Sequence, residues 1–178
     1  CQDNDISWYD WNLDEEQQRF LAFVRDMIAI RREQAVFRRR GFLEGSVSGE
    51  ADTKDIHWLK PDDSEMTAED WKDPSSGSLG VLLTAEAIDE IDETGRAVSG
   101  DTMLLLINGN DRHVEFRLAR RGGVRRWERL LDTWFEEPVS EKRRLFRPGG
   151  TYLLQARSVA LFRGLARGPR SWFTARLG

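Results

Sequence analysis

Carboxylates are the side chains best supplied for chemistry in this 178-residue chain, which holds 31 Asp and Glu residues. Two carboxyl groups about 5–5.5 Å apart can cleave a glycosidic bond with retention, one as acid/base and the other as nucleophile. Many of these residues fall in polar stretches such as 86–101, where solvated surface is the alternative interpretation. The residue types therefore leave a glycosidase-type pair open but do not locate it.

Other catalytic chemistry finds little support in the sequence. The chain has no G-x-S-x-G nucleophile motif and no glycine-rich phosphate loop. Cys1 is the one cysteine and has no nearby histidine, and the two histidines, His57 and His113, lie far apart. We therefore expect no thiol nucleophile, no internal disulfide framework, no metal site and no other cofactor. A single cysteine suits a reducing compartment, so the sequence predicts a cytoplasmic protein.

Charge and hydropathy narrow the choice of partners. The formal net charge is −4, which disfavours nucleic acid as the main partner, although arginine is locally dense. The longest apolar runs, such as Met103–Ile107, are too short to cross a bilayer, and no stretch has the pattern of a secretory signal. We expect neither nucleic acid nor a membrane as a partner.

Aromatic residues offer a second kind of chemistry, the stacking of rings on sugars. Trp58, Trp71, Trp127 and Trp134 could form such a surface, or they could pack in the protein core and at its edge. His57 stands beside Trp58 in an alternating segment, and we interpret it as a half-buried structural residue rather than a base. Composition and spacing alone thus identify no active site.

Residues 14–34 give the strongest helix signal among the elements that must position these side chains. Asp14 can cap the helix, and Gln17 completes a capping-box pattern. Basic residues at 31–32 and 38–40 are interpreted as a solvated helix end rather than a nucleic-acid surface. A broad apolar stripe along the helix needs a partner; it consists of Phe20, Phe23, Val24, Met27, Ile28 and Ile30, with Leu21 on its flank.

After Gly41 the hydrophobic period changes to two, which is typical of strands. Residues 102–108 indicate a strand buried on both faces, 113–118 indicate a half-exposed strand, and NGND at 108–111 predicts a tight hairpin between them. Further strands are predicted around 56–58 and at 79–84, 127–131, 144–147, 151–155 and 158–162. The predicted fold is mainly β, an antiparallel β-sandwich preceded by one amphipathic helix. Its expected core includes Leu104, Leu106, Val114, Phe116, Leu118, Val159 and Leu161.

Seven stretches carry a resemblance to a known family: CQDNDISWYDW, IAIRREQAVFRR, DIHWLKPDDSEMTAEDW, LGVLL, GDTMLLLINGNDRHVEFRL, WERLLDT and RSVALF. In this order they resemble the C-terminal part of bacterial isoamylase-type glycogen debranching enzymes, members of the α-amylase superfamily of glycoside hydrolases. The resemblance covers most of residues 1–163. In that family a (β/α)8 barrel carries the active site, and a β-sandwich follows it.

This resemblance implies a division into three parts. Residues 1–41 would be the loop and last helix of a truncated (β/α)8 catalytic barrel, 42–163 the C-terminal β-sandwich domain, and 164–178 a loosely ordered tail. The family's nucleophile, acid/base and stabilising carboxylates all precede the matched segment, so no carboxylate of this chain is expected to be catalytic. Asp3, Asn4 and Trp8 would lie at the mouth of the barrel and bind substrate; the alternative is that they only fix the loop.

For the parent enzyme, the resemblance implies hydrolysis of α-1,6-glucosidic branch linkages in glycogen-like α-glucans, with the sandwich as a structural companion. The alternative is a carbohydrate-binding module that holds α-glucan through exposed aromatics; coplanar, exposed tryptophans on one sheet face would favour it. The expected partners are the missing barrel and the glucan. Without the barrel, the stripe of residues 14–34 is expected to drive self-association, or the region before residue 14 is expected to be disordered.

Overall fold

The fold combines one long helix with short strands. A computed structural model describes residues 2–48, 53–88, 91, 95 and 98–166. Within these residues, helix α1 (Glu15–Glu33) is followed by ten strands and three short 3₁₀ helices. The strands are β1 (Val47–Ser48), β2 (Thr53–Lys54), β3 (Ile56–Leu59), β4 (Ser78–Leu83), β5 (Met103–Asn108), β6 (Val114–Arg117), β7 (Arg126–Asp132), β8 (Val139–Phe146), β9 (Thr151–Leu154) and β10 (Ser158–Leu165). The 3₁₀ helices are η1 (Ala35–Phe37), η2 (Asp70–Lys72) and η3 (Ala85–Ala87).

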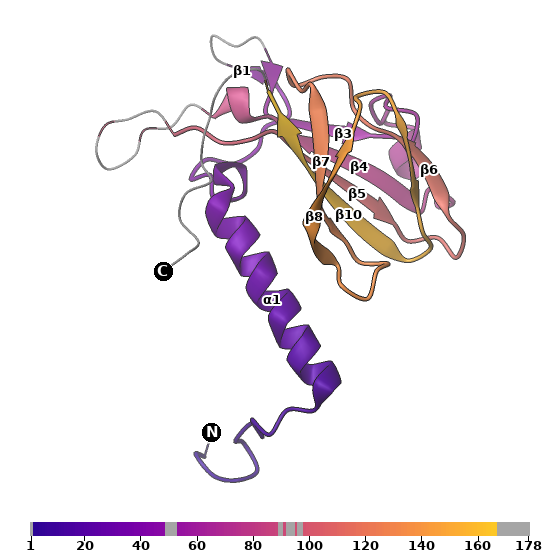
Figure 1. Cartoon of the computed structure of the whole chain (residues 1–178). Helices are drawn as coiled ribbons and strands as arrows, with labels where there is room; N and C mark the ends of the chain where they lie inside the picture. The colour runs from indigo at the N-terminus through magenta and orange to yellow at the C-terminus, as the bar shows by residue number, and fades with distance from the viewer. Residues whose placement is uncertain (1, 49–52, 89–90, 92–94, 96–97, 167–178) are drawn as a thin grey trace.

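Two antiparallel layers form the sandwich. The larger layer is a six-stranded sheet in the order β3-β4-β5-β10-β7-β8, and the smaller layer is the β6-β9 pair. Figure 1 shows this pair beside the larger sheet, on the side away from α1. Strands β1 and β2 form a separate short ribbon. The predicted mainly β, antiparallel fold preceded by one helix is confirmed.

A hydrophobic core fills the space between the two layers. Leu104 and Leu106 enter it from β5, and Phe116 enters it from β6. Trp127 of β7 is fully buried there, and its indole N–H donates to the carbonyl oxygen of Ala119 at 2.9 Å. Full burial of a large apolar side chain is worth about 1.5–3 kcal/mol. The apolar run of β5 and the alternation of apolar residues in β6 thus identified much of this core.

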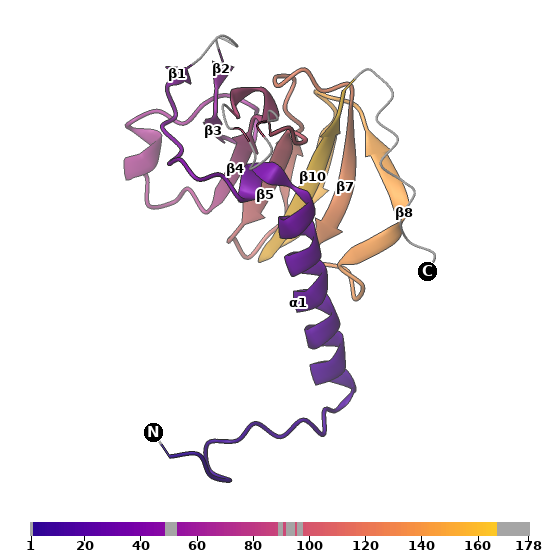
Figure 2. The same ribbon diagram turned by 90° about the vertical axis from the view of Figure 1, so that its left-hand side faces the viewer.

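Helix α1 covers part of the opposite face of the six-stranded sheet (Figure 2). Phe23, Met27 and Ile30 of the helix pack against a second apolar cluster that includes Met103 and Leu161. Successive residues of β5 thus point alternately into two clusters, which confirms the prediction that this strand is buried on both faces. No residue of α1 is fully buried, so the helix is covered on one side only.

The predicted start of α1 is confirmed in detail. The Asp14 carboxylate accepts from the Gln17 backbone N–H at 2.8 Å, and the Gln17 side chain accepts from the Asp14 backbone N–H at 3.0 Å. This reciprocal pair satisfies two backbone donors at the helix N-terminus. Arg31 and Arg32 lie in the last turn, where their charge opposes the negative end of the helix dipole.

The predicted hairpin at residues 108–111 is wrong. Strand β5 pairs with β4 on one side and β10 on the other, so neither edge is left for β6, which pairs with β9. The turn instead carries the chain from one layer to the other. The buried Asn108 side chain holds it by donating to the carbonyl oxygens of Arg112 and Gln155 at 2.9 and 2.8 Å.

Two further expectations concern strand β10 and the tail that follows it. Val159 was expected in the core, but it is half-buried, opposite Ile107, and belongs to neither apolar cluster. It lies on the face that α1 covers only in part. Strand β10 continues to Leu165, past the start of the predicted tail, and residues 167–178 of that tail lie outside the described residues.

Candidate functional site

The three residues predicted to bind substrate lie in the loop before α1, and Asp3 and Trp8 are in contact. The indole N–H of Trp8 donates to the Asp3 carboxylate. Asn4 instead shapes the turn, because its side-chain oxygen accepts from the Ile6 N–H at 3.2 Å and its carbonyl from the Trp8 N–H at 3.1 Å. Trp8 remains 61% exposed, and the loop lies at the end of α1 that points away from the sandwich (Figures 1 and 2). These contacts fix the loop and leave the tryptophan open to solvent.

Glu65 is the centre of an ion cluster that the sequence did not reveal. Its carboxylate accepts from Lys54 Nζ at 2.6 Å and from Arg121 at 3.2 Å, and His57 Nδ1 lies 2.7 Å away. Hydrogen bonds from Lys54 and from His57 lower the pKa of Glu65. The His57 side chain is only 11% exposed, which confirms its interpretation as a structural residue. The cluster joins residues far apart in sequence, so no local pattern could have shown it.

Trp58 and Trp71 form an exposed aromatic pair at the β3 edge of the six-stranded sheet. Their ring centroids are 5.6 Å apart, but the ring planes meet at 77°. Trp127 is buried, and Trp134 is exposed on the connection between β7 and β8. A stacking surface for sugars needs ring faces that lie in one plane, whereas this pair meets edge to face. The alternative of a carbohydrate-binding module is therefore not favoured.

A buried polar network links β7 to β9. The Tyr152 hydroxyl donates to the Asp132 carboxylate and accepts from an Arg129 NH group at 3.0 Å. Burial of the phenol and its hydrogen bond to Asp132 raise the pKa of Tyr152 to about 12. The Arg129 guanidinium also lies over the Phe135 ring, 4.5 Å from its centroid. Each polar group of this network has a partner, so it serves to hold the layers together.

A second buried carboxylate, Glu128, lies on β7 and is only 3% exposed. It accepts from Arg143 and from Arg163, each at 2.5 Å. Burial alone would raise the pKa of Glu128, but the hydrogen bonds from the two guanidinium groups outweigh it and lower the pKa. The side chain is ionised and paired, and these contacts make it a structural anchor for β8 and β10.

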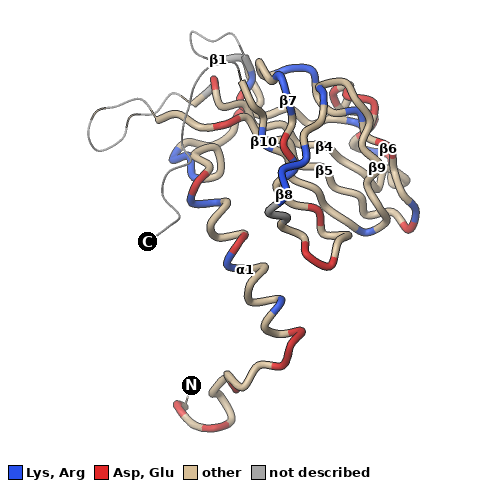
Figure 3. Tube along the Cα trace, in the orientation of Figure 1, with Lys and Arg blue, Asp and Glu red and all other residues tan. Residues whose placement is uncertain are grey.

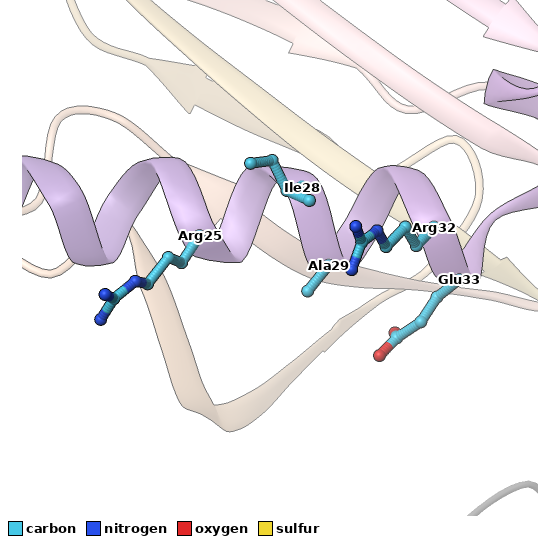
Figure 4. Close-up of a pocket in the computed structure, with 5 residues that line it drawn as sticks. All are labelled: Arg25, Ile28, Ala29, Arg32 and Glu33. Carbon is cyan, nitrogen blue, oxygen red and sulfur yellow. The ribbon is translucent and has the colours of Figure 1, made fainter.

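An open depression runs along one side of α1. Its lining consists of Arg25, Ile28, Ala29, Arg32 and Glu33, all from the helix itself (Figure 4). Ile28 is 46% exposed. A surface of this kind, apolar at its centre and flanked by charges, suits packing against another protein surface better than enclosing a small molecule.

A metal site in the part of the chain that the structure describes would need several clustered His, Cys, Asp or Glu side chains. Within that part, no group of three or more His, Cys, Asp or Glu side chains could hold a metal ion. No helix there is long and apolar enough to cross a membrane. Three carboxylates described above already have partners within the fold. Glu65 pairs with Lys54, Glu128 pairs with Arg143, and Asp132 accepts from the Tyr152 hydroxyl.

This chain is similar to known proteins both in sequence and in fold. The chain is 37% identical over 164 residues to glycogen operon protein GlgX homologues of Mycobacterium bovis and Mycobacterium tuberculosis. The match covers 92% of this chain but 22% of each relative, so the chain spans about a fifth of the length of these proteins.

The fold has a solved counterpart in the pullulanase type I of Bacillus subtilis, determined with maltose. The two are 15% identical, with a TM-score of 0.54 over 88% of this chain and 17% of that one. At this identity the likeness concerns the fold alone. Residues 55–163, which include strands β3 to β10 up to Arg163, match the family model described as isoamylase, C-terminal. The chain therefore belongs to the isoamylase C-terminal family.

Proposed function

We propose that this chain is the C-terminal part of a glycogen debranching enzyme that hydrolyses α-1,6-glucosidic branch linkages in glycogen-like α-glucans. The family match and the glycogen-operon relatives support this proposal. The catalytic carboxylates would lie in the rest of the protein, since this chain spans 22% of the relatives' length. The chain alone would then be inactive. A single cysteine supports a cytoplasmic location for the protein.

The observation that carries the proposal is that the sandwich covers only part of the apolar surface of α1. One side, with Phe23, Met27 and Ile30, packs on the sandwich. Phe20, at the N-terminal end of the same stripe, is 65% exposed, and Ile28, farther around the helix, is 46% exposed. Large apolar side chains on an exposed helix face mark a protein-protein contact. Residues 1–41 would belong to the catalytic (β/α)8 barrel, and residues 42–163 would form the sandwich domain that the helix joins to it.

The loop before α1 would supply part of the substrate site. Trp8 has an open ring face, and its indole N–H is held by Asp3. A tryptophan fixed in this way can stack on a sugar ring, and the second carboxylate oxygen of Asp3 can accept a hydrogen bond from a sugar hydroxyl. Asn4 would contribute by holding the turn that presents both residues.

The test compares this chain with the longer gene product that contains it. We expect the longer protein to release reducing ends from glycogen and pullulan, and this chain to release none. In the longer protein, Trp8→Ala should raise KM more than it lowers kcat, because stacking holds the substrate. Trp134→Ala, at another exposed tryptophan, should leave both unchanged. Hydrolysis by this chain alone that survives repurification, and is lost on mutating one of its own carboxylates, would overturn the proposal.

A further inference from the structure

Two arginine-rich segments stand out from the otherwise acidic sequence. Residues 117–126 read RLARRGGVRR, and residues 142–147 read KRRLFR. Together they hold nine of the 27 basic residues and none of the 31 acidic ones. The rest of the chain therefore has 18 basic and 31 acidic residues, a formal charge of −13. The modest net charge of −4 conceals a strong separation of charge.

The fold brings these two segments to one end of the sandwich. The Leu118 N–H donates to the Gly150 carbonyl at 2.8 Å, and Trp127 lies opposite Phe146 in the ladder between β7 and β8. Gly122 and Gly123 have φ values of 76° and 64°, a left-handed conformation that glycine adopts without strain. Figure 3 shows the resulting blue segments at the start of β7 and along β8.

Some of this charge is already neutralised within the fold. Asp63 and Glu65 lie near Arg121, and Glu128 pairs with Arg143. The Glu86 carboxylate also reaches this end, beside the backbone of Gly123. Six exposed arginines form no ion pair with any carboxylate that the structure describes, and we name them the arginine end: Arg117, Arg120, Arg125, Arg126, Arg144 and Arg147.

We propose that the arginine end binds an acidic segment of a partner polypeptide. Guanidinium groups bind carboxylates through paired N–H donors, as Arg143 does with Glu128 within this fold. Nucleic acid is a poorer fit, because single-strand binding relies on exposed aromatics. The aromatic residues at this end are Trp127, which is buried, and Phe146, which packs against the core.

The partner is expected to bind through side chains rather than as an added strand. β8 is the edge strand of the six-stranded sheet. Its ladder is irregular, since Arg129 lies opposite Arg144 while Leu131 lies opposite Val139, so β8 advances five residues where β7 advances two. A bulged, basic edge of this kind resists pairing with another strand. It still presents its cations to a flexible acidic segment.

The test uses the 178-residue chain and a fluorescein-labelled oligoglutamate peptide in an anisotropy titration. We expect binding at low ionic strength that weakens as sodium chloride is added. Arg120→Gln/Arg125→Gln/Arg126→Gln should weaken binding about tenfold. The control is Arg112→Gln/Arg157→Gln, which removes two exposed arginines beside Asn108 and Asn110, at the end of β5 away from the arginine end. This double variant should keep the affinity within about twofold of the wild type.

Several outcomes would overturn the proposal. One is a wild-type chain that does not bind the peptide, and another is a control pair that loses as much affinity as the triple variant. A third is tighter binding of a duplex DNA of equal charge, which would assign the surface to nucleic acid. Circular dichroism checks that each variant is folded. If the triple variant is not, Arg144→Gln/Arg147→Gln must weaken binding in its place.

Discussion

Removing the Tyr152 hydroxyl isolates the buried polar network between the two layers. Tyr152→Phe keeps the ring, whose centroid lies 4.9 Å from that of Phe162 and 5.3 Å from that of Phe146, but it deletes the group between Asp132 and Arg129. Hydrogen bonds to charged groups are worth about 1.5–3 kcal/mol each. Asp132 and Arg129 remain 3.8 Å apart and can compensate in part. We expect the free energy of unfolding to fall by about 2–3 kcal/mol.

The raised pKa of Tyr152 adds a pH dependence to the stability of this network. Burial first, and then the Asp132 hydrogen bond, raise this pKa from 10.0 to about 12. A difference of about two pH units corresponds to roughly 3 kcal/mol between the protonated and ionised forms. Because the folded state holds the phenol proton more tightly, this stability is complete below pH 10, near the pKa in the unfolded chain, and is lost as the pH rises through about 12.

Urea unfolding followed by tryptophan fluorescence measures both effects. At neutral pH, Tyr152→Phe should unfold at a lower urea concentration than the wild type. Between pH 10 and 12 the wild type should lose stability that the variant has already lost. The urea concentrations at which the two proteins unfold should therefore converge over this pH range. Tyr9→Phe is the matched control, because Tyr9 is the other tyrosine and is 60% exposed. A Tyr152→Phe variant within about 0.5 kcal/mol of the wild type at neutral pH would refute this account of the network.

Three other predictions follow from the packing and the charges. Phe116→Ala should cost about 3–5 kcal/mol of unfolding free energy, because the ring is 1% exposed in the core, whereas Phe42→Ala, at a 95% exposed ring, should cost less than about 0.5 kcal/mol in the same denaturant titration. Glu128→Gln should make the stability of the fold less sensitive to acid. The lowered pKa of Glu128 provides stability above about pH 4.5 that is lost as the pH falls. Melting temperatures measured from pH 3 to 7 test this, and a variant whose melting temperature falls with pH as steeply as that of the wild type contradicts it. The chain should self-associate through α1, and Phe20→Asp/Ile28→Asp should shift it to monomer in sedimentation velocity; a monomeric wild type excludes that association.

Local signals in the sequence identified individual elements well. The capping residues Asp14 and Gln17 marked the start of α1 to within one residue, because a capping box depends only on residues three apart. The alternation at 113–118 placed β6, and the continuous apolar run at 102–108 placed β5, because both signals are also local.

Relations between distant segments could not be read in this way. The NGND turn signal at 108–111 is real, but a turn does not state which strands pair, and β10 occupies the place beside β5 that a hairpin would need. Glu65 looked like one more loop acid, yet three basic partners from residues 54, 57 and 121 converge on it. Asp3, Asn4 and Trp8 rested on the family resemblance; the structure shows their mutual contacts, and their contact with substrate stays a prediction.

Helix α1 shows why periodicity alone understates what a helix does. Its apolar stripe was expected to need a partner, with the sandwich covering part of it and a missing domain covering the rest, and the sheet does cover only part of it. Phe23, Met27 and Ile30 meet the sheet, while Phe20 and Ile28 remain exposed. At about 100° per residue, Ile28 lies a quarter turn or more around the helix from the packed residues, whereas Phe20 lies on their side, nearer the N-terminus of the helix. A helix that is apolar over so wide an arc can bind two bodies at once, and its angle then fixes how they are oriented. Under the proposed function, α1 would join the sandwich to the catalytic part of the debranching enzyme, and its exposed apolar side chains would be covered there.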